Sequence, residues 1–112
     1  MSAKVGIVIP CYKAKGLVNK VVDSILYVYS QMKEKFSFMI YVVDDCCPEK
    51  SYEEIKNNKI IKVLKHEQNL GVGAATITGF RKAKEDNCKI FIKLDADCPH
   101  NPIYLLDLIE YI

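Results

Sequence analysis

Aspartate pairs follow two apolar segments of this 112-residue sequence, and carboxylates in such places can bind metal ions. Asp95 and Asp97 come directly after the apolar run 89–94, and residues two apart in extended backbone point to the same side. Two such carboxylates repel each other unless a positive charge lies between them. Mg²⁺ or Mn²⁺ suits this place, because these ions bind carboxylates, water and substrate phosphates. Two solvated turn aspartates are the simpler alternative, but the end of a buried strand favours a metal site.

The second pair, Asp44 and Asp45, ends the apolar run 36–43. Adjacent residues in extended backbone point to opposite sides, so one of the two is expected to face a ligand. That carboxylate could accept hydrogen bonds from a base N–H or a ribose hydroxyl. The other could cap a turn or a helix, and capping explains the pair as well as ligand binding does.

Gly71 and Gly73 stand at the predicted start of a helix. Glycine permits a close backbone approach, and a helix N-terminus favours anions, so this segment can contact a phosphate. Tight packing of helix on sheet is an equal alternative. The third glycine of a dinucleotide-binding fingerprint is absent, and there is no Gly-Lys-Ser/Thr of a Walker A loop.

Cysteine and histidine side chains could form a soft-metal site, with His66 or His100 as a partner, but no spacing matches a zinc pattern. The odd cysteine count and the adjacent pair argue against a disulfide framework, which favours a reducing cytosol. The cysteines are Cys11, Cys46, Cys47, Cys88 and Cys98.

Apolar periodicity predicts alternating strands and helices, and hence an α/β fold: a Rossmann-like, mostly parallel sheet with flanking helices. Ligands of such sheets bind beyond the carboxyl ends of the strands, where the polar residues above converge. The predicted strands are 4–10, 36–43, 60–64 and 89–94, and the predicted helices are 16–35, one opening at 51, 74–86 and one opening at 102.

The composition is that of one soluble globular domain over residues 1–112, with 50% apolar and 27% charged residues. A net charge of +2 gives no reason to expect nucleic acid as a partner. No apolar run is long enough to span a membrane, and no signal peptide is evident. The sequence stops inside an apparent helix, so we expect the domain to be incomplete at its C-terminal end.

Four ordered motifs resemble those of family 2 glycosyltransferases, which have the GT-A fold. They are Val8-Ile-Pro-Cys-Tyr12, Val42-Val-Asp-Asp45, Asn69-Leu-Gly-Val-Gly-Ala-Ala75 and Lys93-Leu-Asp-Ala-Asp97. Within that family the sequence looks most similar to enzymes that transfer sugar to a polyprenyl phosphate.

The resemblance implies a nucleotide-diphosphate sugar donor, UDP- or GDP-linked, and a Mn²⁺ or Mg²⁺ cofactor. The implied donor-binding residues are Pro10, Tyr12, Asp44, Asp45, Gly71, Gly73 and Asp95, and the implied metal ligands are Asp95 and Asp97. Tyr12 would pack on the base, Asp45 and Asp44 would hydrogen-bond the base or ribose, and the metal would neutralise the donor diphosphate.

The resemblance has departures and gaps. Cys46-Cys47 stands where the family usually has Gly-Ser, and Lys13 where it often has Asn. The family's general base and acceptor site would lie beyond Ile112, so no catalytic base is assigned and the chain alone is expected to be inactive.

The acceptor would be a polysaccharide, a glycan or a lipid phosphate. The protein is expected in the cytoplasm, reaching a membrane only through a missing C-terminal part or a lipid acceptor.

Three other functions fit parts of the pattern. A receiver-type phosphoacceptor domain also has aspartates at strand ends, but its acidic pair should follow the first strand. A non-catalytic nucleotide-binding or interaction module would share the fold, and exposed apolar surface would favour self-association. A nucleotidyltransferase would show a glycine-rich basic loop after the first strand, of which the segment 11–16 is a faint version.

Overall fold

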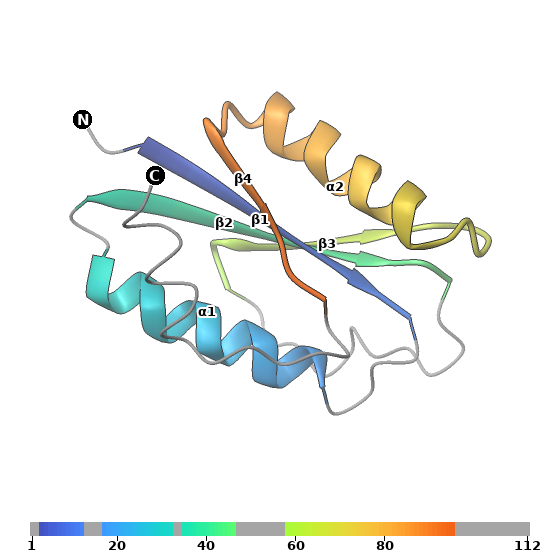
Figure 1. Cartoon of the computed structure of the whole chain (residues 1–112), viewed down its shortest axis with the longest axis horizontal. Coiled ribbons are helices and arrows are strands. Elements are labelled where there is room, and N and C mark those ends of the chain that lie inside the picture. The colour runs from blue at the N-terminus through green and yellow to red at the C-terminus, as the bar shows by residue number, and fades with distance from the viewer. Residues whose placement is uncertain (1–2, 13–16, 33–34, 47–57, 96–112) are drawn as a thin grey trace.

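The computed structural model describes residues 3–12, 17–32, 35–46 and 58–95 (Figure 1). The helices predicted from residues 51 and 102 lie outside these ranges, as do Asp97 and His100. The described elements are β1 (Ala3–Cys11), α1 (Val18–Met32), β2 (Phe36–Asp44), β3 (Ile61–Lys65), α2 (Val72–Glu85) and β4 (Ile90–Lys93). Each of them overlaps the strand or helix that periodicity predicts, with ends that differ by no more than three residues.

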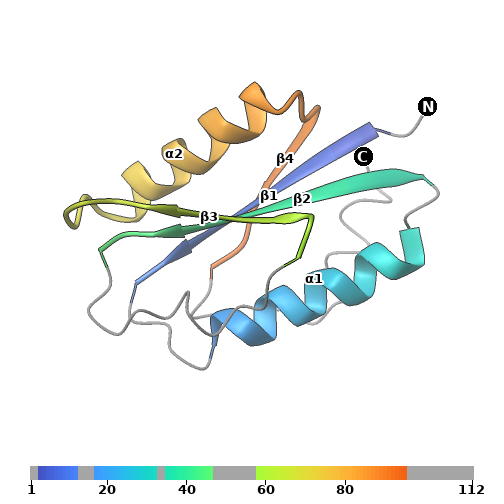
Figure 2. The same ribbon diagram turned by 180° about the vertical axis from the view of Figure 1, so that it is seen from behind.

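The four strands form one sheet in the order β3-β2-β1-β4, and every neighbouring pair is parallel. The path from β1 to β2 runs across the sheet in one direction, and the path from β3 to β4 runs back. Right-handed crossovers therefore place α1 and α2 on opposite faces, as both views show (Figures 1 and 2). The predicted parallel α/β sheet is confirmed.

Two hydrophobic layers hold the helices on the sheet. On one face, Val21, Ile25 and Val28 of α1 join the cluster that contains Ile7 and Ile40 of the central strands. A smaller cluster lies on the other face of the sheet, where alanines of α2 pack against the side of β1 that carries Val8. Small residues suit α2 because its backbone lies close to the sheet, and Gly79 is the position of closest approach.

The expectation of a buried strand at 89–94 is wrong for part of its length. Among the residues described, β4 is paired only with β1 and lies at a sheet edge. Ile92 faces the α1 layer and is buried, whereas Phe91 on the other face is 43% exposed. A continuous apolar run therefore does not distinguish a buried strand from an edge strand with one open face.

A polar cluster fixes the C-terminal end of α2. The hydroxyl of Tyr41, a fully buried residue, donates to Asp86 Oδ2 at 2.7 Å, and Lys62 Nζ lies 2.8 Å from the same oxygen. Burial and the hydrogen bond to Asp86 raise the pKa of Tyr41. The hydrogen bonds from Lys62 and Tyr41 lower the pKa of Asp86. The cluster thus keeps a neutral phenol beside a paired carboxylate.

No helix within the described ranges is both long and apolar enough to cross a membrane.

Candidate functional site at the carboxyl edge of the sheet

The parallel register brings the strand ends together at one edge. Cys11 at the end of β1 pairs with Asp44 of β2, and Asp44 pairs with Lys65 of β3. His66 and Asp95 follow β3 and β4 at the same edge. The convergence predicted from the sequence is therefore present for the described residues, whereas Asp97 lies outside them.

Asp45 is buried at this edge, with 3% of its surface exposed, and its carboxylate is bound from within the protein. The backbone N–H of Leu70 donates to Oδ1 and that of Gly71 to Oδ2, both at 2.8 Å. His66 Nδ1 lies 2.8 Å from Oδ1. Asp45 therefore ties the end of β2 to the loop that enters α2.

Competing effects set the pKa of Asp45. Burial raises it, because a charged carboxylate loses hydration. The hydrogen bonds from the Leu70 N–H, His66 and the Gly71 N–H lower it, and together they outweigh burial, so the pKa lies below its ordinary value of 3.8. The carboxylate is thus ionised at neutral pH.

His66 continues this network into α2, a role that sequence reasoning missed. Its Nε2 lies 2.8 Å from Thr78 Oγ1, and that hydroxyl lies 3.0 Å from the backbone oxygen of Ala74. The Nδ1 beside Asp45 must carry a proton to donate. The sequence signal for this role was the position of His66 directly after β3, which places it beside the end of β2. The backbone N–H of His66 donates to the backbone carbonyl of Asp44 at 2.8 Å.

Asp44 and Asp45 occupy opposite faces, as alternation along β2 predicts. Val42 belongs to the α1 layer and Val43 to the α2 layer, which puts Asp44 on the α1 side and Asp45 on the α2 side. Asp44 is 5% exposed. The two carboxylates therefore serve different surroundings, as the sequence suggested.

Two residues predicted to line a base pocket come from the end of β1. Pro10 is buried within the strand and pairs with Val43. Tyr12 follows the strand and is 40% exposed, so its ring has an accessible surface on which a flat group can stack.

Gly71 and Gly73 do not pack against the sheet, so the packing alternative is wrong for them. Gly71 caps α2 with φ 98, a backbone conformation that favours glycine. A Cβ added to either glycine would meet nothing within 4 Å.

The Asp95 carboxylate is half-exposed just beyond β4. Its Oδ1 lies 3.2 Å from Lys93 Nζ, so a lysine supplies a positive partner for this carboxylate. A hard oxygen ligand of this kind fits Mg²⁺ or Mn²⁺. No group of three potential metal-binding side chains occurs within the described ranges, and the second predicted ligand, Asp97, lies outside them.

The lowered pKa of Asp45 predicts acid sensitivity. A carboxyl whose pKa is lower in the folded protein stabilises it fully above the unfolded pKa, and this contribution is lost as the pH falls through the folded pKa. We expect Asp45→Asn to be less stable than the wild type at pH 7, and the difference to shrink below about pH 4. Urea unfolding at several pH values measures this. A difference that stays constant down to pH 2 would contradict it.

Comparisons with known proteins agree with this geometry. Residues 6–112 match the sequence model of glycosyl transferase family 2. The chain is 30% identical to the dolichol-phosphate mannosyltransferase of Pyrococcus furiosus over 112 residues, which cover 97% of this chain and 30% of that protein. It is 32% identical over 123 residues to the UDP-N-acetylglucosamine–dolichyl-phosphate N-acetylglucosaminyltransferase of Methanococcus voltae. That alignment covers 95% of this chain and 46% of that protein. The chain spans less than half the length of either relative.

Solved structures show the same fold. The structure of S. aureus TarS 1-349 superposes with a TM-score of 0.73 at 24% identity, covering 97% of this chain and 32% of that one. A longer TarS structure gives the same TM-score and is covered over 19% of its length. These likenesses support the predicted GT-A type of α/β sheet. Because the family match extends over nearly the whole sequence, the chain belongs to glycosyl transferase family 2.

Proposed function

We propose that this chain binds the nucleotide-sugar donor of a glycosyltransferase whose acceptor is a polyprenyl phosphate. The observation that carries the proposal is the convergence of Tyr12, Asp44, Gly71 and Asp95 at the carboxyl edge of one parallel sheet. Family membership supplies the reaction class. The names of both curated relatives, which include dolichol phosphate or dolichyl phosphate, support a lipid-phosphate acceptor.

Each candidate residue is assigned to a different part of the nucleotide-sugar donor. Tyr12 stacks on the base and Pro10 shapes the strand end beneath it. We assign Asp45 and Asp44, at the end of β2, to the base or the ribose. The backbone at Gly71 and Gly73 approaches the diphosphate, because the N-terminus of α2 favours negative charge.

Asp95 and Asp97 would hold the Mg²⁺ or Mn²⁺ ion of this site, since carboxylate oxygens are suitable ligands. A bound ion of this kind supplies positive charge that stabilises the diphosphate as a leaving group. Lys93, whose Nζ lies 3.2 Å from Asp95 Oδ1, adds positive charge to the same edge.

The proposed transfer breaks the bond between the sugar's anomeric carbon and the donor diphosphate oxygen. A new bond forms from that carbon to an oxygen of the acceptor phosphate, and the nucleoside diphosphate leaves. A phosphomonoester is largely ionised near pH 7, so this acceptor oxygen needs little help from a side-chain base. A donor-binding domain without an assigned base is thus compatible with a lipid-phosphate acceptor.

We place this activity in the cytoplasm, at a membrane face where a nucleotide sugar and a lipid phosphate can meet. Two features support the placement: five cysteines without a disulfide framework, and relatives named for lipid phosphates.

A thermal-shift panel tests the proposal with UDP, GDP, CDP and AMP, each with and without Mn²⁺. We expect one diphosphate to raise the melting temperature only with Mn²⁺, because a ligand at 100 times its Kd adds about 2.7 kcal/mol to folded-state stability. Asp97→Asn should abolish the shift, whereas Asp23→Asn, on the exposed side of α1, should keep it. A cooperative melt that no nucleotide shifts would contradict donor binding and favour an interaction module.

A further inference from the structure

The ring of His66 lies between two groups of the carboxyl edge and contacts both of them. Its Nδ1 lies 2.8 Å from Asp45 Oδ1, and its Nε2 lies 2.8 Å from Thr78 Oγ1 of α2. The side chain of His66 is 8% exposed and that of Asp45 is 4% exposed, so water competes little for these contacts. The ring therefore links the end of β2 to α2 through both of its nitrogens.

The pair of Asp45 and His66 holds α2 at two points along the helix axis. At the entry, the N–H groups of Leu70 and Gly71 donate to Asp45. Farther along, Thr78 contacts the ring of His66. Thr78 follows Gly71 by seven positions, which corresponds to a rise of about 10 Å along a helix. A helix that is held at one point can still tilt, whereas two points also fix its direction.

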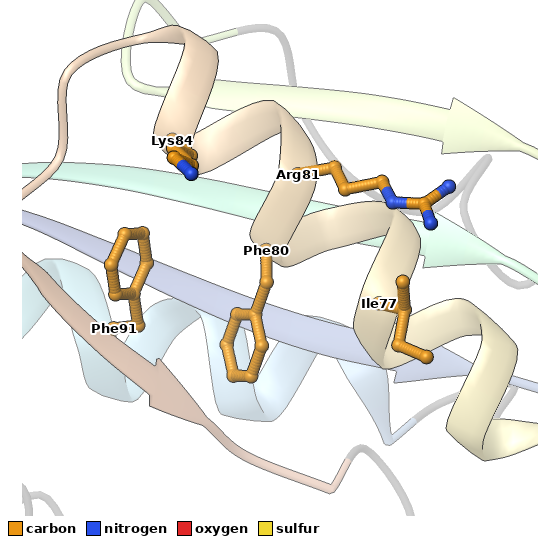
Figure 3. A pocket seen from close by; sticks show the side chains of 5 residues that line it. All are labelled: Ile77, Phe80, Arg81, Lys84 and Phe91. Atoms are coloured by element: carbon orange, nitrogen blue, oxygen red, sulfur yellow. The ribbon is translucent and has the colours of Figure 1, made fainter.

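The side of α2 that faces β4 is less constrained in the described part of the chain. Phe80 lies about 200° around the helix from Thr78, at 100° per residue, and its ring meets Phe91 with centroids 5.8 Å apart (Figure 3). An apolar groove of about 370 Å³ lies beside these rings. Ile77 and Phe91, which line the groove, are 52% and 43% exposed. The polar contacts at the ends of β2 and β3 therefore contribute much of what orients α2.

We propose that His66 is a positioning residue for the donor site, because it sets the direction of α2 and the place of the loop before it through Thr78 and Asp45. The inference rests on the proposed function, in which Asp45 contacts the base or ribose and the backbone at Gly71 approaches the diphosphate. His66 touches the first of these groups and holds the helix that follows the second. It acts through them and needs no contact with the nucleotide.

Substitutions at Thr78 test this role with little disturbance of the fold. Thr78→Val keeps the shape of the side chain but loses the hydroxyl, whereas Thr78→Ser keeps the hydroxyl. Thr76→Val is the matched control, because the Thr76 hydroxyl donates to the Val72 carbonyl of the same helix at 2.8 Å. In the nucleotide-free chain, we expect Thr78→Val to shift the backbone amide NMR signals of Leu70 and Gly71. The other two variants should leave these signals near their wild-type positions.

Titration with UDP and GDP in the presence of Mg²⁺ measures the consequence for binding. We expect Thr78→Val to raise the Kd of the nucleotide that binds the wild type about fivefold, the equivalent of one net hydrogen bond. Thr78→Ser and Thr76→Val should stay within about twofold of the wild type. His66→Asn keeps an N–H near the Nδ1 position but does not reach Thr78, so its effect should match that of Thr78→Val. Combining the two should add little, because both break the same contact.

The two measurements separate this inference from the proposed function. A wild-type chain that binds neither nucleotide would contradict the proposed function, and shifted signals of Leu70 and Gly71 in Thr78→Val would then support the positioning of the loop alone. A wild-type chain that binds, with Thr78→Val as tight as Thr78→Ser, would overturn the role in donor binding. Unchanged signals of Leu70 and Gly71 in Thr78→Val would overturn the proposal outright, as would additive effects of His66→Asn and Thr78→Val.

Discussion

Replacing Asp45 with alanine should remove about 3–5 kcal/mol from the free energy of unfolding. The substitution leaves the N–H groups of Leu70 and Gly71 without their acceptor, and it removes the carboxylate beside the buried ring of His66. Each N–H group that loses its acceptor in this partly buried network costs desolvation free energy, so the losses accumulate at one place. Urea unfolding followed by circular dichroism at pH 7 measures the difference.

Two comparisons separate this network from a general effect of losing an aspartate. Asp45→Asn keeps an acceptor oxygen but loses the charge, so its stability should lie between those of wild type and Asp45→Ala. Asp23→Ala removes an exposed carboxylate from α1 and should change stability by no more than about 0.5 kcal/mol. A loss for Asp45→Ala no larger than that for Asp23→Ala would show that the network contributes little.

Gly79→Ala is the second large effect that we expect, at about 1–3 kcal/mol of lost stability. A Cβ at this position would lie 2.8 Å from Val8 Cγ2 and 3.1 Å from Val8 Cβ, closer than van der Waals contact allows. Val8 is fully buried in the central strand β1 and cannot turn away into solvent. The substitution must therefore push α2 off the sheet.

Gly73→Ala is the matched control in the same helix. Its new Cβ meets nothing within 4 Å, and alanine is a better helix former than glycine, so stability should stay equal or rise by up to about 1 kcal/mol. Chemical denaturation of both variants gives the comparison. Equal effects of the two substitutions would mean that contact with Val8 does not limit the approach of α2.

Much of the fold follows from sequence periodicity because parallel strands and amphipathic helices leave strong local signals. The continuous run at 36–43 predicted a central strand, and the spacing of Val21, Ile25 and Val28 predicted one face of α1. The order of strands and helices then implied a parallel sheet with its strand ends at one edge, and the four motifs resembled the family that the comparisons confirm. The receiver-type and nucleotidyltransferase alternatives have no comparable support.

Contacts between distant segments were less predictable. The sequence left open which aspartate of the pair is bound within the protein, because the partners of Asp45 lie 21 to 26 residues away. It treated His66 only as a candidate metal ligand, although the ring lies between a carboxylate and Thr78. It also missed Gly79, whose role depends on how closely α2 approaches β1. Such roles depend on tertiary packing, which single-sequence patterns do not encode.

The central claim is that a nucleoside diphosphate binds at the carboxyl edge of the sheet. Backbone amide NMR shifts of the 112-residue chain, titrated with UDP or GDP in the presence of Mg²⁺, test it most directly. We predict the largest changes at Tyr12, Gly71 and Asp95, with Asp86 and Lys89 at the opposite end unchanged. Changes centred on Asp86 and Lys89, or no change with either nucleotide, would contradict the assignment of this edge as the donor site.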